Sequence, residues 1–224
     1  MTPLEWFAIG LSLRVALASV LLTLPVAVAV AFCLVRYRVR GRSVLEALLM
    51  APLVVPPLVT GYLLLVAVGP NSGLGTFFRA LTGSDLAFSA SGAVLAAAVV
   101  SFPLVYRPVK TAIEGIDPRY ALVSRSLGVG RFRTFLRVTL PLAWPGVLSG
   151  VVLGFARSLG EFGATIMVAG NIPYRTTTVP LAIFSAFNQR DGEAAAARLV
   201  LVSLGISVVA LVASEWLSRR ARRA

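Results

Sequence analysis

Long apolar runs dominate this chain and restrict what it can fold into. Five stretches reach the length of about 20 apolar residues that a helix needs to cross the hydrocarbon core of a bilayer. They are Leu11–Val35, Val44–Val68, Ala87–Tyr106, Pro145–Val168 and Ala194–Leu217. The pattern predicts an all-α, polytopic membrane protein with five transmembrane helices, and we expect residues 1–224 to form a single membrane domain.

The scarcity of polar chemistry excludes several kinds of protein. The chain is 58% hydrophobic and 13% charged, whereas soluble domains are about 25% charged. It contains no histidine, and Cys33 is its single cysteine. Zinc sites built from Cys and His, disulfides and histidine-based triads are therefore excluded. We expect no catalytic residues and no metal site.

The basic residues predict how the spans are oriented. Fifteen of the 21 Lys and Arg residues fall in three segments that alternate with poorly charged ones. These fifteen are Arg36, Arg38, Arg40 and Arg42; Arg107, Lys110, Arg119, Arg125, Arg131, Arg133 and Arg137; and Arg219, Arg220, Arg222 and Arg223. The positive-inside rule places these segments in the cytoplasm. The N-terminus is then outside and the C-terminus inside. We ascribe the formal charge of +12 to topology and anionic lipid, and expect no nucleic-acid partner.

Two apolar segments need separate treatment. The first one starts near Leu4, lacks a basic segment before it and is too long for a signal peptide, so we expect it to be retained as a span. The segment Thr178–Phe187 is short and contains Pro180. It predicts a short helix lying in or near the interface rather than a sixth span.

The segment 107–144 is long, predicted to be cytoplasmic, and patterned like folded structure. Asp117 followed by Pro118 is a favourable helix start. The helix Arg119–Leu127 would carry an apolar stripe on one face, made of Tyr120, Val123 and Leu127.

Glycines and a proline predict the rest of this hairpin. Gly128 and Gly130 can end the first helix in a left-handed cap. A second short helix, Phe132–Val138, would stop at Leu140-Pro141 before the fourth span. The hairpin could be a surface loop without a partner, but an exposed apolar stripe bordered by arginines favours a docking role.

The same hairpin resembles a known family. Gly128, then Val138 ten residues later, then Leu140 and Pro141, match the spacing of the "EAA" loop of ABC importer permeases. The E-A-A positions hold Leu122, Val123 and Ser124 instead. The later stretch Gly160-Glu-Phe-Gly-Ala-Thr165 is similar to the oxyanion branch of that family, most of all to molybdate permeases, with sulfate permeases next.

The resemblance implies a type I ABC importer permease fold and a set of partners. These are a second permease copy, a pair of ABC ATPase subunits, and an external binding protein that delivers a tetrahedral oxyanion, molybdate or tungstate. It also implies the inner membrane of a bacterial cell. The expected coupling residues are Tyr120, Leu122, Val123, Ser124, Leu127, Gly128, Val138, Leu140 and Pro141.

The chain lacks an ATP site of its own by sequence. A P-loop needs G-x-x-x-x-G-K-[ST]. Lys110 is the one lysine and Thr111 follows it, but Leu104 and Val109 occupy the two glycine positions. We therefore expect no cofactor on this chain, with ATP and Mg on the partner ATPase, and alternating access driven from there.

Charges inside a span are costly, at about 3 kcal/mol each near the centre. Arg157 and Glu161 lie four residues apart on the predicted fourth span and would share one helical face. They could form a neutralising structural pair, or they could line the route of the anion. The structural alternative is favoured because a route for a hydrated anion needs only weak interactions. Thr165 belongs to the same candidate pathway.

Prolines interrupt the predicted second span at Pro52, Pro56 and Pro57. They predict either a bent helix whose freed carbonyls find neighbours, or a broken helix facing the pathway. Gly146, Gly150 and Gly154 form a ridge of small residues that could pack against a second permease or within the chain.

Two other classes of protein fit the sequence less well. A secondary transporter commonly carries several intramembrane acids or internal repeats, and only Glu161 lies deep. A membrane enzyme would need acid–base groups placed together, which the sequence does not offer.

Overall fold

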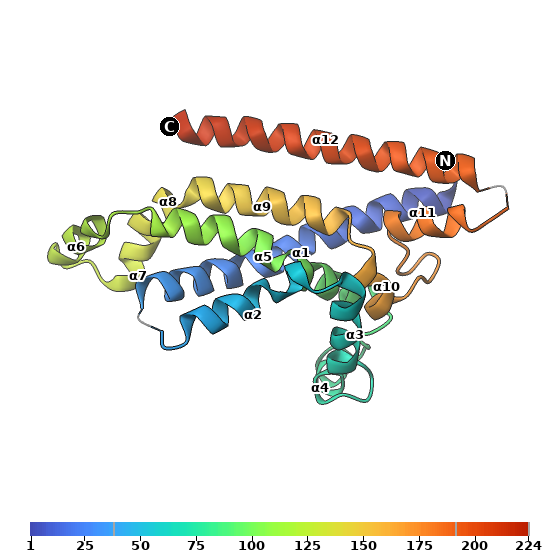
Figure 1. Ribbon diagram of the computed structural model, residues 1–224, viewed down its shortest axis with the longest axis horizontal. Coiled ribbons are helices and arrows are strands. Elements are labelled where there is room, and N and C mark those ends of the chain that lie inside the picture. The colour runs from blue at the N-terminus through green and yellow to red at the C-terminus, as the bar shows by residue number, and fades with distance from the viewer. Residues whose placement is uncertain (38, 191, 224) are drawn as a thin grey trace.

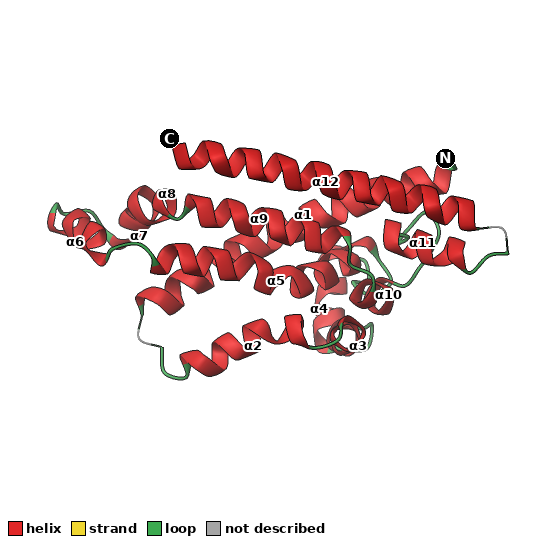
Figure 2. Cartoon of the chain, turned by 45° about the horizontal axis from the view of Figure 1, so that its top comes forward, coloured by secondary structure: helices red, strands yellow, loops and turns green. Residues whose placement is uncertain are grey.

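The computed structural model describes the backbone of residues 1–37, 39–190 and 192–223, and the side chains of these residues except 210, 211 and 213–223. All secondary structure in these ranges is helical (Figure 2). The helices are α1 (Pro3–Arg36), α2 (Arg42–Val54), α3 (Pro57–Val68), α4 (Gly73–Thr82), α5 (Ala90–Glu114), α6 (Pro118–Ser126), α7 (Arg131–Thr134), the π-helical turn η1 (Phe135–Thr139), α8 (Leu140–Leu142), α9 (Trp144–Leu159), α10 (Gly163–Ala169), α11 (Val179–Phe187) and α12 (Glu193–Arg223).

The long helices run side by side along the long axis of the molecule (Figure 1). α1, α5 and α9 form the centre, and α12 and α2 flank it. The short helices α6, α7 and α8 gather at one end, and α10 and α11 lie toward the other. α3 and α4 project to one side. The predicted all-α architecture is therefore confirmed.

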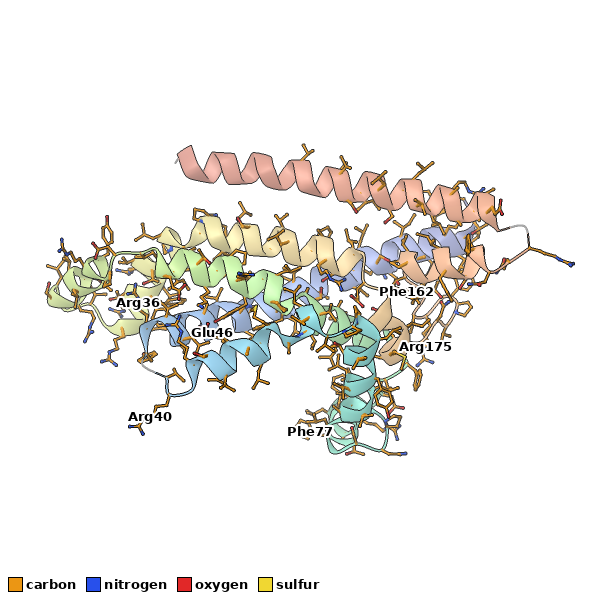
Figure 3. The ribbon with its side chains drawn as sticks, in the orientation of Figure 1. Arg36, Arg40, Glu46, Phe77, Phe162 and Arg175 are labelled. Atoms are coloured by element: carbon orange, nitrogen blue, oxygen red, sulfur yellow. The ribbon has the colours of Figure 1, made fainter. Side chains whose placement is uncertain are left out.

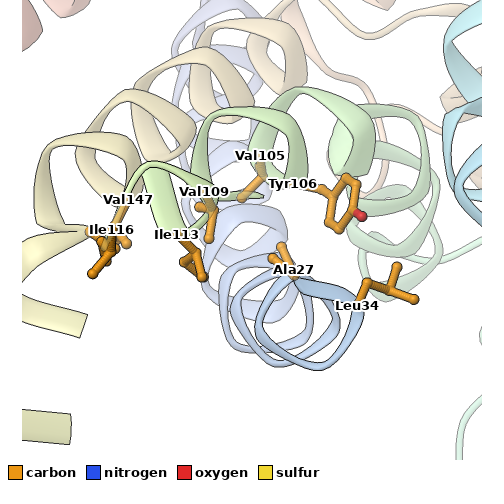
Figure 4. Packing of buried hydrophobic residues seen from close by; sticks show 10 residues of the cluster. Ala27, Leu34, Val105, Tyr106, Val109, Ile113, Ile116 and Val147 are labelled. Atoms are coloured by element: carbon orange, nitrogen blue, oxygen red, sulfur yellow. The ribbon is translucent and has the colours of Figure 1, made fainter. Parts of the chain in front are cut away.

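Small residues allow the central helices to approach closely. Buried side chains of α1, α5 and α9 meet in one cluster that includes Ala27, Val105 and Val147 (Figure 4). A Cβ atom added to Gly150 would lie 2.7 Å from the carbonyl oxygen of Val105. Gly146 and Gly154 also face α5. The glycine ridge therefore packs within the chain rather than against a second copy.

Two helices, α1 and α5, are individually long and apolar enough to cross a bilayer in the described part of the chain. Two bent pairs raise the count to four: α2 with α3, and the segment Arg131–Leu142 with α9. The expected five spans stay a prediction.

The predicted second span is a broken helix. α2 ends at Val54 and α3 begins at Pro57, with an angle of 113° between them. Pro56 and Pro57 explain the break, because neither can donate a backbone hydrogen bond to the preceding turn. α2 therefore ends two residues before Pro56, and α3 begins at Pro57.

The predicted fourth span, Pro145–Val168, is not one helix. α9 ends at Leu159, residues 160–162 are non-helical, and α10 begins at Gly163. The Glu161 carboxylate stabilises this break, because its Oε1 accepts a hydrogen bond from the backbone N–H of Ala164 at 2.8 Å. Hydropathy does not register such an interruption, since both sides of it are apolar.

The short helix predicted at Thr178–Phe187 is confirmed as α11. It packs against α12 and α1. Its first backbone N–H, that of Val179, donates to the Ser12 hydroxyl at 2.8 Å, and Leu181 is fully buried. Its place relative to a membrane interface stays a prediction.

Candidate functional site

The first candidate site is the hairpin formed by α6, α7, η1 and α8. α6 starts as predicted, because the Asp117 carboxylate accepts a hydrogen bond from the Arg119 N–H at 2.8 Å and Pro118 occupies the first helical position. Gly128 has φ +80° and provides the left-handed turn after α6. Gly130 has φ −63° and instead precedes α7.

The expected stop of the second hairpin helix is wrong. The helical segment does not halt at Leu140-Pro141, since it continues from Arg131 to Leu142 and bends by 70° before α9. The backbone N–H of Leu140 bonds to the carbonyl of Phe135, five residues back. This wider π-helical turn makes room for the Pro141 ring, which would clash in a regular α-helix.

The start of the predicted hairpin also shifts. Residues 107–114 continue α5 rather than opening the hairpin. The long helix therefore extends directly into the base of the hairpin.

The structure divides the predicted coupling residues into two groups. Tyr120, Val123 and Leu127 are 58%, 60% and 77% exposed. No other described element covers them. Leu122 and Pro141 are also exposed. The face made by Tyr120, Val123 and Leu127 is hereafter the α6 apolar face.

The other coupling residues hold the hairpin together. The Ser124 hydroxyl lies 3.0 Å from the Thr134 hydroxyl and joins α6 to α7. Leu140 packs against the central cluster, and Val138 is half-buried. The E-A-A serine thus serves the internal structure of the loop, while its neighbours face outward.

A network of ion pairs lies near the base of the hairpin. The Glu46 carboxylate lies 2.7 Å from Arg42 and 2.9 Å from Lys110. Glu114 pairs with the same two cations at 2.5 and 3.7 Å. None of the α2 side chains is fully buried, although Leu49 and Met50 pack against the central cluster. The ion pairs therefore add a polar link between α2 and α5 to this apolar packing. The i, i+4 spacings predict the pairs Arg42–Glu46 and Lys110–Glu114 within each helix. They do not predict the pairs that join α2 to α5.

The second candidate site is the break between α9 and α10. A guanidinium nitrogen of Arg157 lies 2.7 Å from Glu161 Oε2. The side chain of Glu161 is 2% exposed and that of Arg157 29% exposed. The two oxygens of Glu161 therefore have different tasks, since Oε1 caps α10 and Oε2 faces the guanidinium. Oε2 forms an ion pair with Arg157 but has no hydrogen-bond partner among the described residues.

The remaining candidate pathway residues lie where the two broken helices cross. A Cβ added to Gly163 would lie 2.9 Å from the Cβ of Pro57, and one added to Gly61 would lie 2.7 Å from the Cα of Ala164. α3 thus crosses α10 in direct backbone contact. Thr165 of α10 is fully buried, and its hydroxyl lacks a hydrogen-bond partner in the described ranges. Pro56 is exposed at the break.

The two sites lie at different places along the molecule. Arg36 and Glu46 lie toward the hairpin end, and Phe162 lies toward the opposite end (Figure 3). The Phe162 ring contacts Phe184 of α11, with ring centroids 5.3 Å apart. Sequence reasoning missed the crossing of α3 and α10, because no local signal links residues 57–61 to residues 163–167.

The class of protein to which this helical fold belongs is shown by a comparison of the sequence with known families. The family described as "Binding-protein-dependent transport system inner membrane component" matches residues 16–223. The chain belongs to this family, and the predicted membership in the ABC importer permeases is confirmed.

Particular relatives narrow the comparison. The chain is 46% identical over 222 residues to the molybdenum transport system permease protein ModB of Escherichia coli K12, covering 99% of this chain and 97% of that protein. It is 46% identical over 220 residues to ModB of Haemophilus influenzae, covering 98% and 96%. The probable sulfate transport system permease protein cysT of Nephroselmis olivacea is 33% identical over 221 residues, covering 99% and 77%.

Solved structures share the fold. A bacterial alginate ABC transporter in complex with an alginate pentasaccharide-bound periplasmic protein matches with a TM-score of 0.77 at 16% identity, covering 98% of this chain and 80% of that one. The MetNI methionine ABC transporter in an inward-facing conformation matches with a TM-score of 0.66 at 14% identity, covering 97% and 94%. The type I ABC importer permease fold is therefore confirmed.

Proposed function

We propose that this chain is the permease subunit of an ABC importer that translocates molybdate or tungstate into a bacterial cell. The observation that carries the substrate class is the similarity to ModB proteins over nearly the whole chain. Sulfate is the second candidate, supported by the lower similarity to cysT. Molybdate, tungstate and sulfate share a charge of −2 and a tetrahedral shape, so the pathway itself discriminates weakly among them.

The proposed topology has five spans, with the N-terminus outside and the C-terminus in the cytoplasm. α1, the pair α2–α3, α5, the pair α9–α10 and α12 supply the crossings. The segregation of fifteen basic residues into alternate connections supports this arrangement. In this topology the hairpin of α6–α8 faces the cytoplasm and α11 lies toward the outside.

The hairpin is the proposed coupling element. The α6 apolar face docks on an ATPase subunit, which holds ATP and Mg, and an internal bond between Ser124 and Thr134 stiffens the hairpin. Because residues 107–114 continue α5, a push on α6 is carried into a helix of the central bundle. Two copies of the chain, two ATPase subunits and an external oxyanion-binding protein complete the importer, and closure of the ATPase pair reorients the spans.

The break between α9 and α10 is the proposed gate region. Irregular backbone at membrane depth is tolerated where it lines a cavity or is covered by protein. If the pair lines the route, Arg157 supplies positive charge for an anion, and Glu161 keeps that charge from holding the anion too tightly. The same pair also fixes the geometry of the break, because Glu161 caps α10 through Oε1 and forms the ion pair with Arg157 through Oε2.

Transport in a defined system tests the proposal. The chain is reconstituted in vesicles with its ATPase and delivery protein, and uptake of radiolabelled molybdate is measured against unlabelled tungstate and sulfate. We expect uphill uptake that needs ATP and is displaced better by tungstate than by sulfate. Uphill uptake without the ATPase, or displacement by sulfate alone, would contradict the proposal.

A further inference from the structure

A cavity of about 350 Å³ lies between the end of α1 and the hairpin, and its lining is mostly apolar apart from three arginines and two threonines. Its walls include Arg36 from α1, Arg125 from α6 and Arg131 from α7. This volume falls in the range of small-molecule sites, about 300–1,000 Å³. The cavity lies at the hairpin end of the molecule, where Arg36 is found (Figure 3).

The charges of this cavity are not neutralised by the described residues around it. No Asp or Glu is among the residues that line it. The nearest acids along the chain are already engaged, because Asp117 caps α6 and Glu114 pairs with Arg42. One terminal nitrogen of Arg36 is buried without a hydrogen-bond partner in the described ranges. A buried unpaired donor of a charged group is costly, so a ligand that accepts its hydrogen bond stabilises the site.

The rest of the cavity is built to hold its shape. The rings of Phe32 in α1 and Phe135 in η1 pack edge to face with centroids 4.6 Å apart, which joins the two sides of the cavity. The hydrogen bond between Ser124 and Thr134 fixes α6 against α7. The three arginines are therefore carried by helices that are tied to one another.

We propose that this cavity binds a phosphoryl-type oxyanion, held by Arg36, Arg125 and Arg131. Guanidinium groups match tetrahedral oxyanions through paired, charge-assisted hydrogen bonds. The anion is either the phosphate of an anionic lipid headgroup or a free oxyanion. A lipid source follows if α1 ends at the inner membrane surface, and in that respect the inference rests on the proposed topology. The free anion needs no such assumption.

Occupancy of this site has a mechanical consequence. The anion bridges the end of α1 to both helices of the hairpin. Because the Phe32–Phe135 contact already joins α1 to η1, a bound anion would add a second link, from α1 to α6 and α7, and would stiffen the connection between α1 and the hairpin. The site therefore provides a way for an inner-leaflet lipid or a cytoplasmic anion to regulate coupling.

Binding is tested on the chain in complex with its ATPase, in nanodiscs. In one arm the lipid is phosphatidylcholine alone, and binding of radiolabelled inorganic phosphate is measured. In the other arm phosphatidylglycerol replaces part of the lipid, and its retention is measured by native mass spectrometry. Arg131→Gln and Arg36→Gln are compared with Arg133→Gln, a matched control on α7 that does not line the cavity.

We expect saturable binding in at least one arm, and the arm identifies the source. Arg131→Gln should weaken it about tenfold, the loss expected for one charge-assisted hydrogen bond, while Arg133→Gln should not. Arg131 is exposed, so this variant folds even if Arg36→Gln does not.

Two outcomes overturn the inference: no binding in either arm, or equal weakening by Arg131→Gln and Arg133→Gln. Molybdate uptake is measured in parallel. Intact uptake without anion binding refutes the anion site while leaving the proposed function in place.

Discussion

Removing the charge of Glu161 should destabilise the break between α9 and α10 in a way that depends on Arg157. Glu161→Gln keeps an oxygen that can accept from the Ala164 N–H, but leaves the guanidinium without a counter-charge. An unpaired charge at the centre of a span costs about 3 kcal/mol. The 29% exposure of Arg157 reduces this, so we expect a loss of about 2 kcal/mol.

The double variant Arg157→Gln/Glu161→Gln separates pairing from capping. Without a charge to strand, it should be more stable than Glu161→Gln alone. Glu161→Ala should be the worst of the set, because it also removes the cap of α10, worth about 1 kcal/mol. A loss of about 2 kcal/mol corresponds to about 4–8 °C in the unfolding midpoint of a chain this long.

Thermal unfolding in nanodiscs measures these differences. Equal or additive losses in the single and double variants would refute the idea that the pair stabilises the break. Molybdate uptake by the double variant then addresses the route. Restored stability with restored uptake supports a structural pair, whereas restored stability with lost uptake supports a role in the pathway.

Three further predictions concern docking, packing and the ion-pair network. Leu127→Asp should abolish co-purification with the ATPase, because docking would bury an apolar side chain worth about 2 kcal/mol. Leu74→Asp, which changes a leucine of α4 that is also well exposed, should not, and an intact complex with Leu127→Asp would contradict the docking assignment. Gly150→Ala should lower the unfolding temperature by several degrees, since its Cβ would lie 2.7 Å from the Val105 carbonyl oxygen, whereas Gly10→Ala meets nothing within 4 Å. If both variants unfold at the same temperature, the close contact of α9 with α5 does not contribute measurably to stability. Glu46→Gln should speed amide hydrogen exchange in α2 about tenfold by weakening both of its ion pairs, and unchanged exchange would show that other contacts hold α2.

Local signals predicted the hairpin well. Asp117 and Pro118 start α6 as expected, and Gly128 supplies the left-handed turn. These features depend on a few neighbouring residues, so the sequence carries them directly. The π-helical turn at Phe135–Thr139 has no comparable signal, because it is a compromise between Pro141 and the packing of Leu140 on the central cluster.

The break between α9 and α10 was only partly predictable from the sequence. The spacing of Arg157 and Glu161 pointed to an ion pair, and the structure contains one. The prediction placed both residues on one continuous helix, whereas the helix ends between them and Glu161 caps the next one. The apolar residues on both sides of the break conceal it from a hydropathy pattern.

The sequence by itself determined that the chain belongs in a lipid bilayer. It also determined the number of long apolar segments and which connections between them carry the basic residues. Those properties are sums over consecutive residues, and transfer from water to lipid depends on such sums. The tertiary structure alone decided that α3 crosses α10 at Gly61 and Gly163 and that the glycine ridge of α9 packs on α5. Such contacts join segments about a hundred residues apart or fix which face of a helix meets which neighbour. They depend on shape and close packing, which a one-dimensional pattern of apolar and charged residues does not specify.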